Sequence, residues 1–239
     1  MKRNVQLKDI SDGRLYTEND RVRAGTGGCS GCSACCQHTT ENIVLDPLDV
    51  MRIKKRLNMS FDELLGQKLV ISEKNLVRTV HPMSTGVYEA CVFLDINGRC
   101  TIHEDRPGFC RIFPLGRIYE KSTSFGSPDS FKYFLQIHEC LSSNRTLVKV
   151  KDYIDVPGDE LDTYNAYICK WHKLISTLES RFESMERDDT LHEGIYKTRI
   201  DEINSSLIDT FMVKDYNAEQ DFYSQFNLRF MEFVMKNRI

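Results

Sequence analysis

Residues 25–38 have the sequence GTGGCSGCSACCQH, and this stretch decides how the rest of the chain is interpreted. Four of its residues are cysteines, and most of the others are small. Glycine and serine at this density favour an irregular loop over a helix or strand. Because four cysteines in eight polar residues cannot all be packed in a core, we expect this loop to hold a metal.

Cys29, Cys32 and Cys35 are spaced three residues apart, so a loop can turn all three sulfurs toward one centre. Bacterial ferredoxins use such a run for a [4Fe–4S] cluster and take a fourth thiolate from elsewhere, whereas zinc modules more often supply two cysteines per loop. The spacing therefore favours an iron–sulfur cluster or iron, with zinc as the alternative. Cys36 would point away from Cys35 in extended backbone, so it would serve a second centre or bridge two metals.

The whole chain has nine cysteines, and only Cys169 lies apart from the others in the sequence. A secreted disulfide framework would need a secretion signal and usually an even number of cysteines. The first twenty residues carry charges where a signal peptide has its apolar segment. We therefore expect a cytoplasmic protein with eight metal-ligating cysteines: Cys29, Cys32, Cys35, Cys36, Cys91, Cys100, Cys110 and Cys140.

Charge and hydropathy exclude two classes of partner. Thirty-two Lys and Arg residues against thirty-five Asp and Glu residues give a net charge of −3. Binding to nucleic acid depends on neutralising phosphates, so this balance argues against a nucleic-acid partner. No segment approaches the roughly 20 apolar residues of a membrane span, so no membrane association is expected.

The fold class predicted is α+β, with a cysteine-rich region over residues 1–150 and a helical region over residues 151–239 that packs on it. Asp46 followed by Pro47, and the Ser60–Glu63 pair, mark two helix starts. Residues 1–25 have no clear period, and the polar residues 121–130 are expected to be a loop. Strands are expected at 43–45, 76–80, 87–94, 112–120 and 131–138.

After residue 158 the apolar period changes to that of helices. One helix is predicted from Leu161 to Met185, with Trp171 in its apolar seam and Cys169 packed beside it. A second is expected around Tyr196 to Phe211. A third carries the phenylalanines at 222, 226, 230 and 233, which are expected to be core residues.

Asn97-Gly98 predicts a hairpin between the segments that carry Cys91 and Cys100. In one register Cys100 faces residue 95, and in the other it faces residue 93. Both registers place the two cysteines on one face of the sheet. They would be offset by about 13 Å or about 7 Å along the strand, and the sequence does not choose between these.

Two arginines, Arg106 and Arg111, flank Cys110 and would offset the negative charge of a thiolate site. Three histidines, His38, His103 and His138, each lie within three residues of a cysteine. We expect these histidines to be hydrogen-bond donors near the site or surface groups rather than metal ligands.

Three segments together resemble a known family: CSGCSACC at 29–36, LDPLDVMRIKKRLNMSFDELL at 45–65 and ACVFLDINGRCTIHEDRPGFCRIFP at 90–114. Their order is similar to that of the CxxCxxCC cysteine-cluster family, described as a zinc- or iron-chelating domain. The resemblance runs from about residue 27 to 115. It implies metal binding through the first seven of the eight cysteines, with Cys140 as a further member.

Several functions are compatible with this sequence. The preferred one is a protein that holds an iron–sulfur cluster or iron and serves redox chemistry, metal handling or protein modification. The alternative is a scaffold stabilised by zinc whose helical region binds a protein partner. A weaker alternative is an enzyme similar to flagellin lysine methylases, which carry a related cluster, although no methyl-donor site is evident. No residue is assigned a catalytic role.

Overall fold

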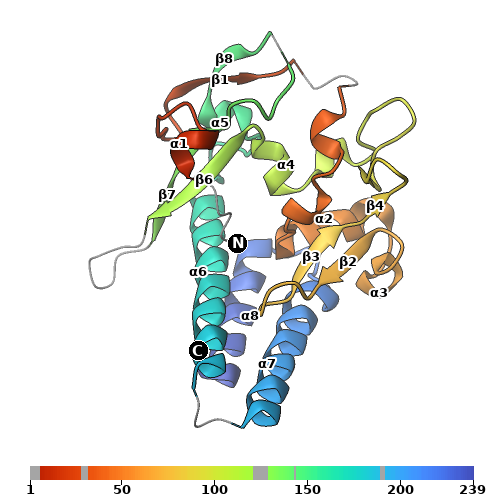
Figure 1. The fold of residues 1–239 in the computed structure, drawn as a ribbon, viewed down its shortest axis with the longest axis vertical. Coiled ribbons are helices and arrows are strands. Elements are labelled where there is room, and N and C mark those ends of the chain that lie inside the picture. Colours follow the sequence, from red (N-terminus) through yellow and green to blue (C-terminus); the bar gives the residue numbers. More distant parts are fainter. Residues whose placement is uncertain (1–5, 28–31, 121–128, 143, 189–191) are drawn as a thin grey trace. The chain divides into compact units, whose positions relative to one another are not determined.

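The computed structural model describes residues 6–27, 32–120, 129–142, 144–188 and 192–239. The fold is mixed α+β, as predicted, with small antiparallel sheets and short helices in the N-terminal half and a helical C-terminal region (Figure 1). Its residues group by their contacts into two compact units. Unit 1 comprises Met1–Ile43 and Ser84–Cys169, and unit 2 comprises Val44–Met83 and Lys170–Ile239. The domain boundary at residue 150 and the docking of the helical region stay predictions.

Unit 1 consists of short elements and the first turns of one long helix. Its helices are α1 (Leu7–Ile10), η1 (Ala34–Cys36), η2 (Thr40–Asn42), η3 (His103–Asp105), α4 (Gly108–Ile112), α5 (Val150–Tyr153) and the start of α6 (Leu161–Glu186). Its strands are β1 (Arg21–Gly25), β4 (Ser84–Thr85), β5 (Ala90–Cys91), β6 (Leu115–Glu120), β7 (Ser130–Leu135) and β8 (Thr146–Lys149).

The core of unit 1 lies around two antiparallel pairs, β6 with β7 and β1 with β8. It contains Tyr16, Val22, Ala24, Ile112, Leu115, Tyr133, Leu135, Val150, Ile154 and Leu161. Gly116 lies opposite Phe134 in the β6–β7 register, and a Cβ at Gly116 would clash with the Phe134 ring. A larger residue at position 116 would therefore require the Phe134 ring to move, because the ring covers the place where a Cβ would stand.

Unit 2 combines two helices from residues 47–64 with the C-terminal helices. It contains α2 (Pro47–Leu57), α3 (Phe61–Leu64), β2 (Leu69–Ser72), β3 (Thr79–Pro82), the rest of α6, α7 (Glu193–Ile208), η4 (Asp209–Val213) and α8 (Phe222–Asn237). Both predicted helix starts are confirmed as capping boxes. Asp46 accepts a hydrogen bond from the Asp49 backbone N–H at 2.9 Å, and Ser60 accepts one from Glu63 at 3.3 Å. In each pair the carboxylate of the later residue, Asp49 or Glu63, accepts a hydrogen bond from the backbone N–H of the earlier residue.

The three predicted C-terminal helices are confirmed as α6, α7 and α8. Trp171 is buried, and its ring centroid lies 5.3 Å from that of Phe211 and 6.4 Å from that of Phe226. Phe226 and Phe233 are almost fully buried, and Phe230 is half-buried. Edge-to-face aromatic contacts of this kind add to the burial of apolar area and hold the helices together.

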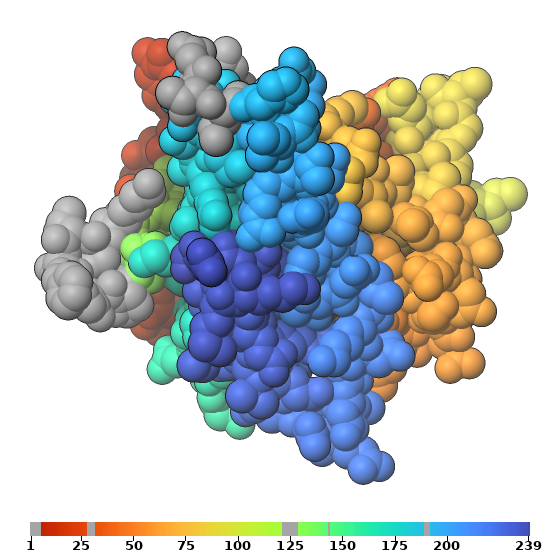
Figure 2. Space-filling model, turned by 90° about the horizontal axis from the view of Figure 1, so that it is seen from below, coloured from red at the N-terminus to blue at the C-terminus, as the bar shows by residue number. Residues whose placement is uncertain are grey.

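Part of α8 remains at the surface. The C-terminal residues, in the darkest blue, are exposed in the view of Figure 2. Leu228, Met231 and Met235 recur at helical spacing and are 65%, 59% and 67% exposed. None of the helices in the described ranges has the length and apolar run that crossing a bilayer requires.

The strands in the cysteine-rich region are shorter than predicted. The strand expected at 43–45 is a single bridge between Leu45 and Val80, and the one expected at 87–94 is only β5. Residues 108–112 form α4, so β6 begins three residues later than expected. Within residues 1–25, β1 was not expected at all. Most of the predicted loop at 121–130 lies outside the described residues.

Candidate metal centre

The predicted ligands that the structure describes all lie in unit 1. Cys32 precedes η1, Cys35 and Cys36 lie in η1, Cys91 ends β5, Cys100 follows the Asn97-Gly98 turn, Cys110 lies in α4, and Cys140 follows β7. Cys29 lies outside the described residues. None of the described cysteines forms a disulfide, as expected for metal ligands or thiol groups.

Cys35 and Cys36 lie together rather than apart. The backbone turns at Ser33, whose φ is +52°, and the Cys36 N–H donates to the Ser33 carbonyl at 2.9 Å. This one-turn 3-10 helix replaces the extended backbone on which the expectation of diverging side chains rested. A hydrogen bond to the Cys36 thiol, together with burial, raises the pKa of Cys35. The two thiols therefore lie within hydrogen-bond reach of each other instead of pointing apart.

A main-chain bridge brings this turn to the segment of Cys91. Gln37 pairs with Ala90, and the His38 N–H donates to the Glu89 carbonyl at 3.2 Å. Cys91 is the next residue after Ala90 and pairs with Ser84 in the short β4–β5 sheet. The bridge thus positions Cys35 and Cys36 beside Cys91 through backbone bonds alone.

Cys100 reaches the same place through a loop whose register differs from both predictions. Leu94, rather than residue 93 or 95, faces Cys100. The Asp95 carboxylate accepts hydrogen bonds from the backbone N–H groups of Asn97 and Arg99, each at 2.8 Å. These bonds hold a loop whose length lies between those of the two predicted registers. The prediction that a regular hairpin places Cys91 and Cys100 on one face was therefore wrong. Cys91 is instead turned by a bond from the Leu94 N–H to its carbonyl at 2.9 Å.

The thiols of Cys35, Cys91 and Cys100 lie within electrostatic reach of one another. Burial raises the pKa of Cys91, and Cys100 and Cys35 raise it further. Burial likewise raises the pKa of Cys100, with a further contribution from Cys35. We call Cys35, Cys36, Cys91 and Cys100 the four-thiol group. It unites cysteines that are up to 65 positions apart in the sequence.

The chemistry of this donor set fits zinc or iron. Clustered, half-buried thiolates repel one another, and a bound cation supplies the positive charge that stabilises them. Soft sulfur ligands select zinc and iron–sulfur centres over magnesium or calcium. Within the described residues, no three or more His, Cys, Asp and Glu side chains have the arrangement of a ready-made metal site. The four-thiol group is thus identified by the closeness of its cysteines and by the chemistry of sulfur ligands, and not by a complete coordination geometry.

The two arginines expected near the site have different surroundings. Arg106 lowers the pKa of Cys100, opposing the effect of burial, and its Nη1 donates to the His103 carbonyl at 2.8 Å. Arg111 is buried and donates to the carbonyls of Glu104, Arg106 and Asp155. Its Nη1 also lies 3.2 Å from the Asp155 carboxylate. Arg106 therefore acts electrostatically on a thiol, whereas Arg111 ties α4 to the turn before it and to the segment after α5.

The histidines and the remaining cysteines are placed as follows. His38 and His138 are exposed, and burial together with Arg106 and Arg111 lowers the pKa of His103. Cys32 is exposed, and Cys110 and Cys140 are half-buried. Metal ligation by these cysteines, by Cys29 and by the four-thiol group stays a prediction. Cys169 is buried in α6, in agreement with a packing role.

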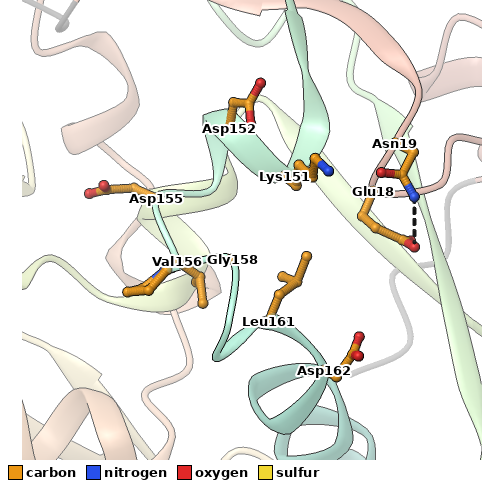
Figure 3. A pocket seen from close by; sticks show the side chains of 10 residues that line it. Glu18, Asn19, Lys151, Asp152, Asp155, Val156, Gly158, Leu161 and Asp162 are labelled. Atoms are coloured by element: carbon orange, nitrogen blue, oxygen red, sulfur yellow. Dashed lines mark hydrogen bonds between the residues drawn. The ribbon is translucent and has the colours of Figure 1, made fainter.

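Unit 1 also contains a cavity of about 500 Å³ whose lining has no cysteine. It is lined by Glu18, Asn19, Lys151, Asp152, Asp155, Val156, Pro157, Gly158, Leu161 and Asp162 (Figure 3). Four of these residues carry carboxylates, one is a lysine, and none is a cysteine. Asp155 belongs to this lining as well as to the Arg111 pair.

Comparison with known proteins bears directly on the thiols. Residues 28–131 match the family model CxxCxxCC, described as "Putative zinc- or iron-chelating domain". This segment is therefore similar to the CxxCxxCC family. The match includes every predicted cysteine ligand except Cys140, and it supports metal binding without distinguishing zinc from iron. No curated protein and no solved structure matches the chain.

Proposed function

We propose that this protein holds iron, as an iron–sulfur cluster or as iron ions, at the four-thiol group and the neighbouring Cys29 and Cys32. The observation that carries the proposal is the proximity of Cys35, Cys91 and Cys100, which come from three separate segments. The regular spacing of Cys29, Cys32 and Cys35 favours a cubane cluster, since a single loop supplies three ligands and a remote segment supplies the fourth.

An iron–sulfur cluster at this position would supply one-electron redox chemistry, and iron ions would suit metal handling or modification of another protein. The residues of this chain would hold and insulate the centre. Half-burial of the thiols limits access of water, and Arg106 offsets part of the negative charge. Charge and solvent exposure are among the properties that set the potential of such a centre.

Zinc is the second candidate, and the adjacent Cys35 and Cys36 thiols favour it. The four-thiol group has the number of sulfurs that a closed structural zinc site uses. In that case the metal would fix the fold of the cysteine-rich region, and the protein would act as a scaffold or interaction module. The exposed apolar residues Leu228, Met231 and Met235 of α8 support a protein partner for the helical region.

Purification of the full chain without air, followed by metal analysis and visible absorption spectroscopy, tests the proposal. A cluster would give brown protein with broad visible absorption and about four irons per cubane. Iron without acid-labile sulfide would indicate iron ions. Colourless protein that contains only zinc would contradict the iron proposal and support the scaffold function.

A further inference from the structure

Unit 2 contains a second cavity, of about 410 Å³, that has no cysteine in its lining. It is bounded by one face of α2, by η4 and by the segment that leads into α8. Lining residues Met51, Lys54, Lys55 and Asn58 recur at the spacing that places side chains on one side of a helix. Its volume lies in the range of pockets that enclose small molecules.

The wall formed by η4 is an irregular feature of the fold. After α7 the chain continues as one π-helical turn, Asp209–Val213, which places Phe211 and Met212 in the lining. Such turns are rare and occur frequently at functional sites. The carbonyls around this turn are bound by two cations. Lys54 donates to Val213 at 2.9 Å, and Arg229 donates to Thr210 at 3.0 Å and to Lys214 at 2.7 Å.

The charges at the cavity leave one cation available for a ligand. The Nζ of Lys54 lies 2.5 Å from the Asp215 carboxylate, so these two lining residues neutralise each other. Lys55 is exposed, and within the described part of the chain no carboxylate pairs with it. The lining therefore carries one net positive charge, which favours a ligand with an anionic group.

The apolar part of the remaining lining, which lies beside the polar residues Asn58, Ser60, Asn217 and Gln220, favours an apolar body. Methionine side chains adapt to the shape of a ligand, and Met51, Met59 and Met212 all line the cavity. Phe222 and Tyr216 supply aromatic surface, with ring centroids 4.7 Å apart. The Arg229 guanidinium lies over the Tyr216 ring, 3.7 Å from its centroid, and holds this part of the cavity wall in place.

From these features we propose that the cavity binds a free medium-chain fatty acid, with its acyl chain against the methionine and aromatic residues and its carboxylate near Lys55. The proposal is independent of the metal centre, because none of the lining residues is a cysteine and all of them lie in unit 2. It accounts for the methionine and aromatic residues of the lining and for the lysine that no carboxylate pairs with.

The single tryptophan provides the readout. Trp171 packs against Phe211, which lines the cavity, so occupancy should change its fluorescence. Decanoate, used below its micelle concentration, should give a saturable change with the full metal-loaded protein. Decanol, which has the same chain length without the charge, should bind about 2–5-fold more weakly, the range expected for an exposed charge interaction.

Variants separate this site from nonspecific binding. Lys55→Gln should weaken decanoate binding about 2–5-fold and leave decanol binding unchanged. Lys236→Gln is the matched control, since Lys236 is exposed in unit 2 and does not line the cavity. Ala218→Phe, which adds a ring to the lining, should abolish binding of both ligands while circular dichroism confirms the helical fold.

Four results would overturn the proposal. Three of them are a fluorescence change that never saturates, equal effects of Lys55→Gln and Lys236→Gln, and undiminished binding by folded Ala218→Phe. Binding to phosphatidylglycerol vesicles without binding of monomeric decanoate would also overturn it, because it would indicate a membrane surface instead of a cavity for free acid.

Discussion

At the scale of single residues, two arginines that look equivalent in the sequence have unrelated environments. Arg106 and Arg111 are five positions apart and flank the same cysteine. In the fold, Arg106 faces Cys100 closely enough to lower its pKa, whereas the Arg111 guanidinium is occupied by three carbonyls and a carboxylate. Proximity in the sequence to a predicted metal ligand therefore does not establish that an arginine acts on a metal site.

This difference predicts opposite outcomes for two matched substitutions. Arg106→Gln removes a charge that favours the Cys100 thiolate, so metal retention against a chelator should weaken about 10–100-fold with little loss of stability. Arg111→Gln leaves buried carbonyls without a charged donor and should lower the free energy of unfolding by about 2–3 kcal/mol. Chelator competition and urea unfolding measure the two effects. Equal loss of metal in both variants at unchanged stability would contradict this assignment.

At the scale of elements, helices were predictable where local chemistry specified them. Asp46 and Ser60 provide caps within three residues of their partners, and the apolar seam of α6 continues over its length. The short strands were not predictable, because β5 has two residues and is held by Gln37, which is 53 positions away from Ala90. The turn at Asn97-Gly98 was predicted correctly, but its register depends on the Asp95 side chain, which a turn dipeptide does not reveal.

The cap of α8 provides a test at this scale. The Ser224 side chain and backbone N–H both donate hydrogen bonds to the Asp221 carboxylate, and they hold the pKa of Asp221 below its ordinary value. Because the folded pKa is lowered, this contribution to stability is present above the unfolded pKa and is lost as pH falls through the folded value. Asp221→Asn should thus be less stable than the natural protein by about 0.3–1 kcal/mol at neutral pH.

Urea unfolding at neutral pH and at successively lower pH measures this difference, which should disappear once Asp221 is protonated in the folded protein. Asp221→Ala, which removes the cap altogether, should lose about 1 kcal/mol at neutral pH. Glu219→Gln is the control, since Glu219 is exposed and its side chain does not cap the helix. A difference between Asp221→Asn and the natural protein that stays constant with pH would show that the cap does not depend on charge.

At the scale of the whole molecule, the sequence predicted which residues are chemically special better than it predicted how the chain groups them. Clustering along the chain identified the cysteines, and the family match supports metal binding by residues 28–131. Val44–Met83 packs with the C-terminal helices although it lies between two cysteine-containing segments. This grouping depends on contacts such as Asn204 Nδ2 donating to the Leu76 carbonyl at 2.8 Å, across more than 120 residues. No periodic pattern in a sequence encodes such a contact.

The same long-range organisation makes the metal centre testable as a whole. If Cys35, Cys91 and Cys100 hold one centre, replacing any one of them with serine should remove most of the bound metal, because each comes from a different segment and none can substitute for another. Cys169→Ser should leave the metal content unchanged, since Cys169 is a buried packing residue outside the four-thiol group. Metal analysis of protein purified without air compares the four variants, with circular dichroism to confirm folding.

The pattern of loss would also distinguish one centre from two. A single centre should be lost completely in each of the Cys35, Cys91 and Cys100 variants, whereas two centres would leave a constant residual amount of metal in some of them. Cys36→Ser is a further variant for this comparison, because the Cys36 thiol contacts that of Cys35 within one turn of helix. Full metal content in the folded Cys35, Cys91 and Cys100 variants alike would show that the proximity of these thiols does not reflect metal ligation, and the centre would then have to lie among Cys29, Cys32, Cys110 and Cys140.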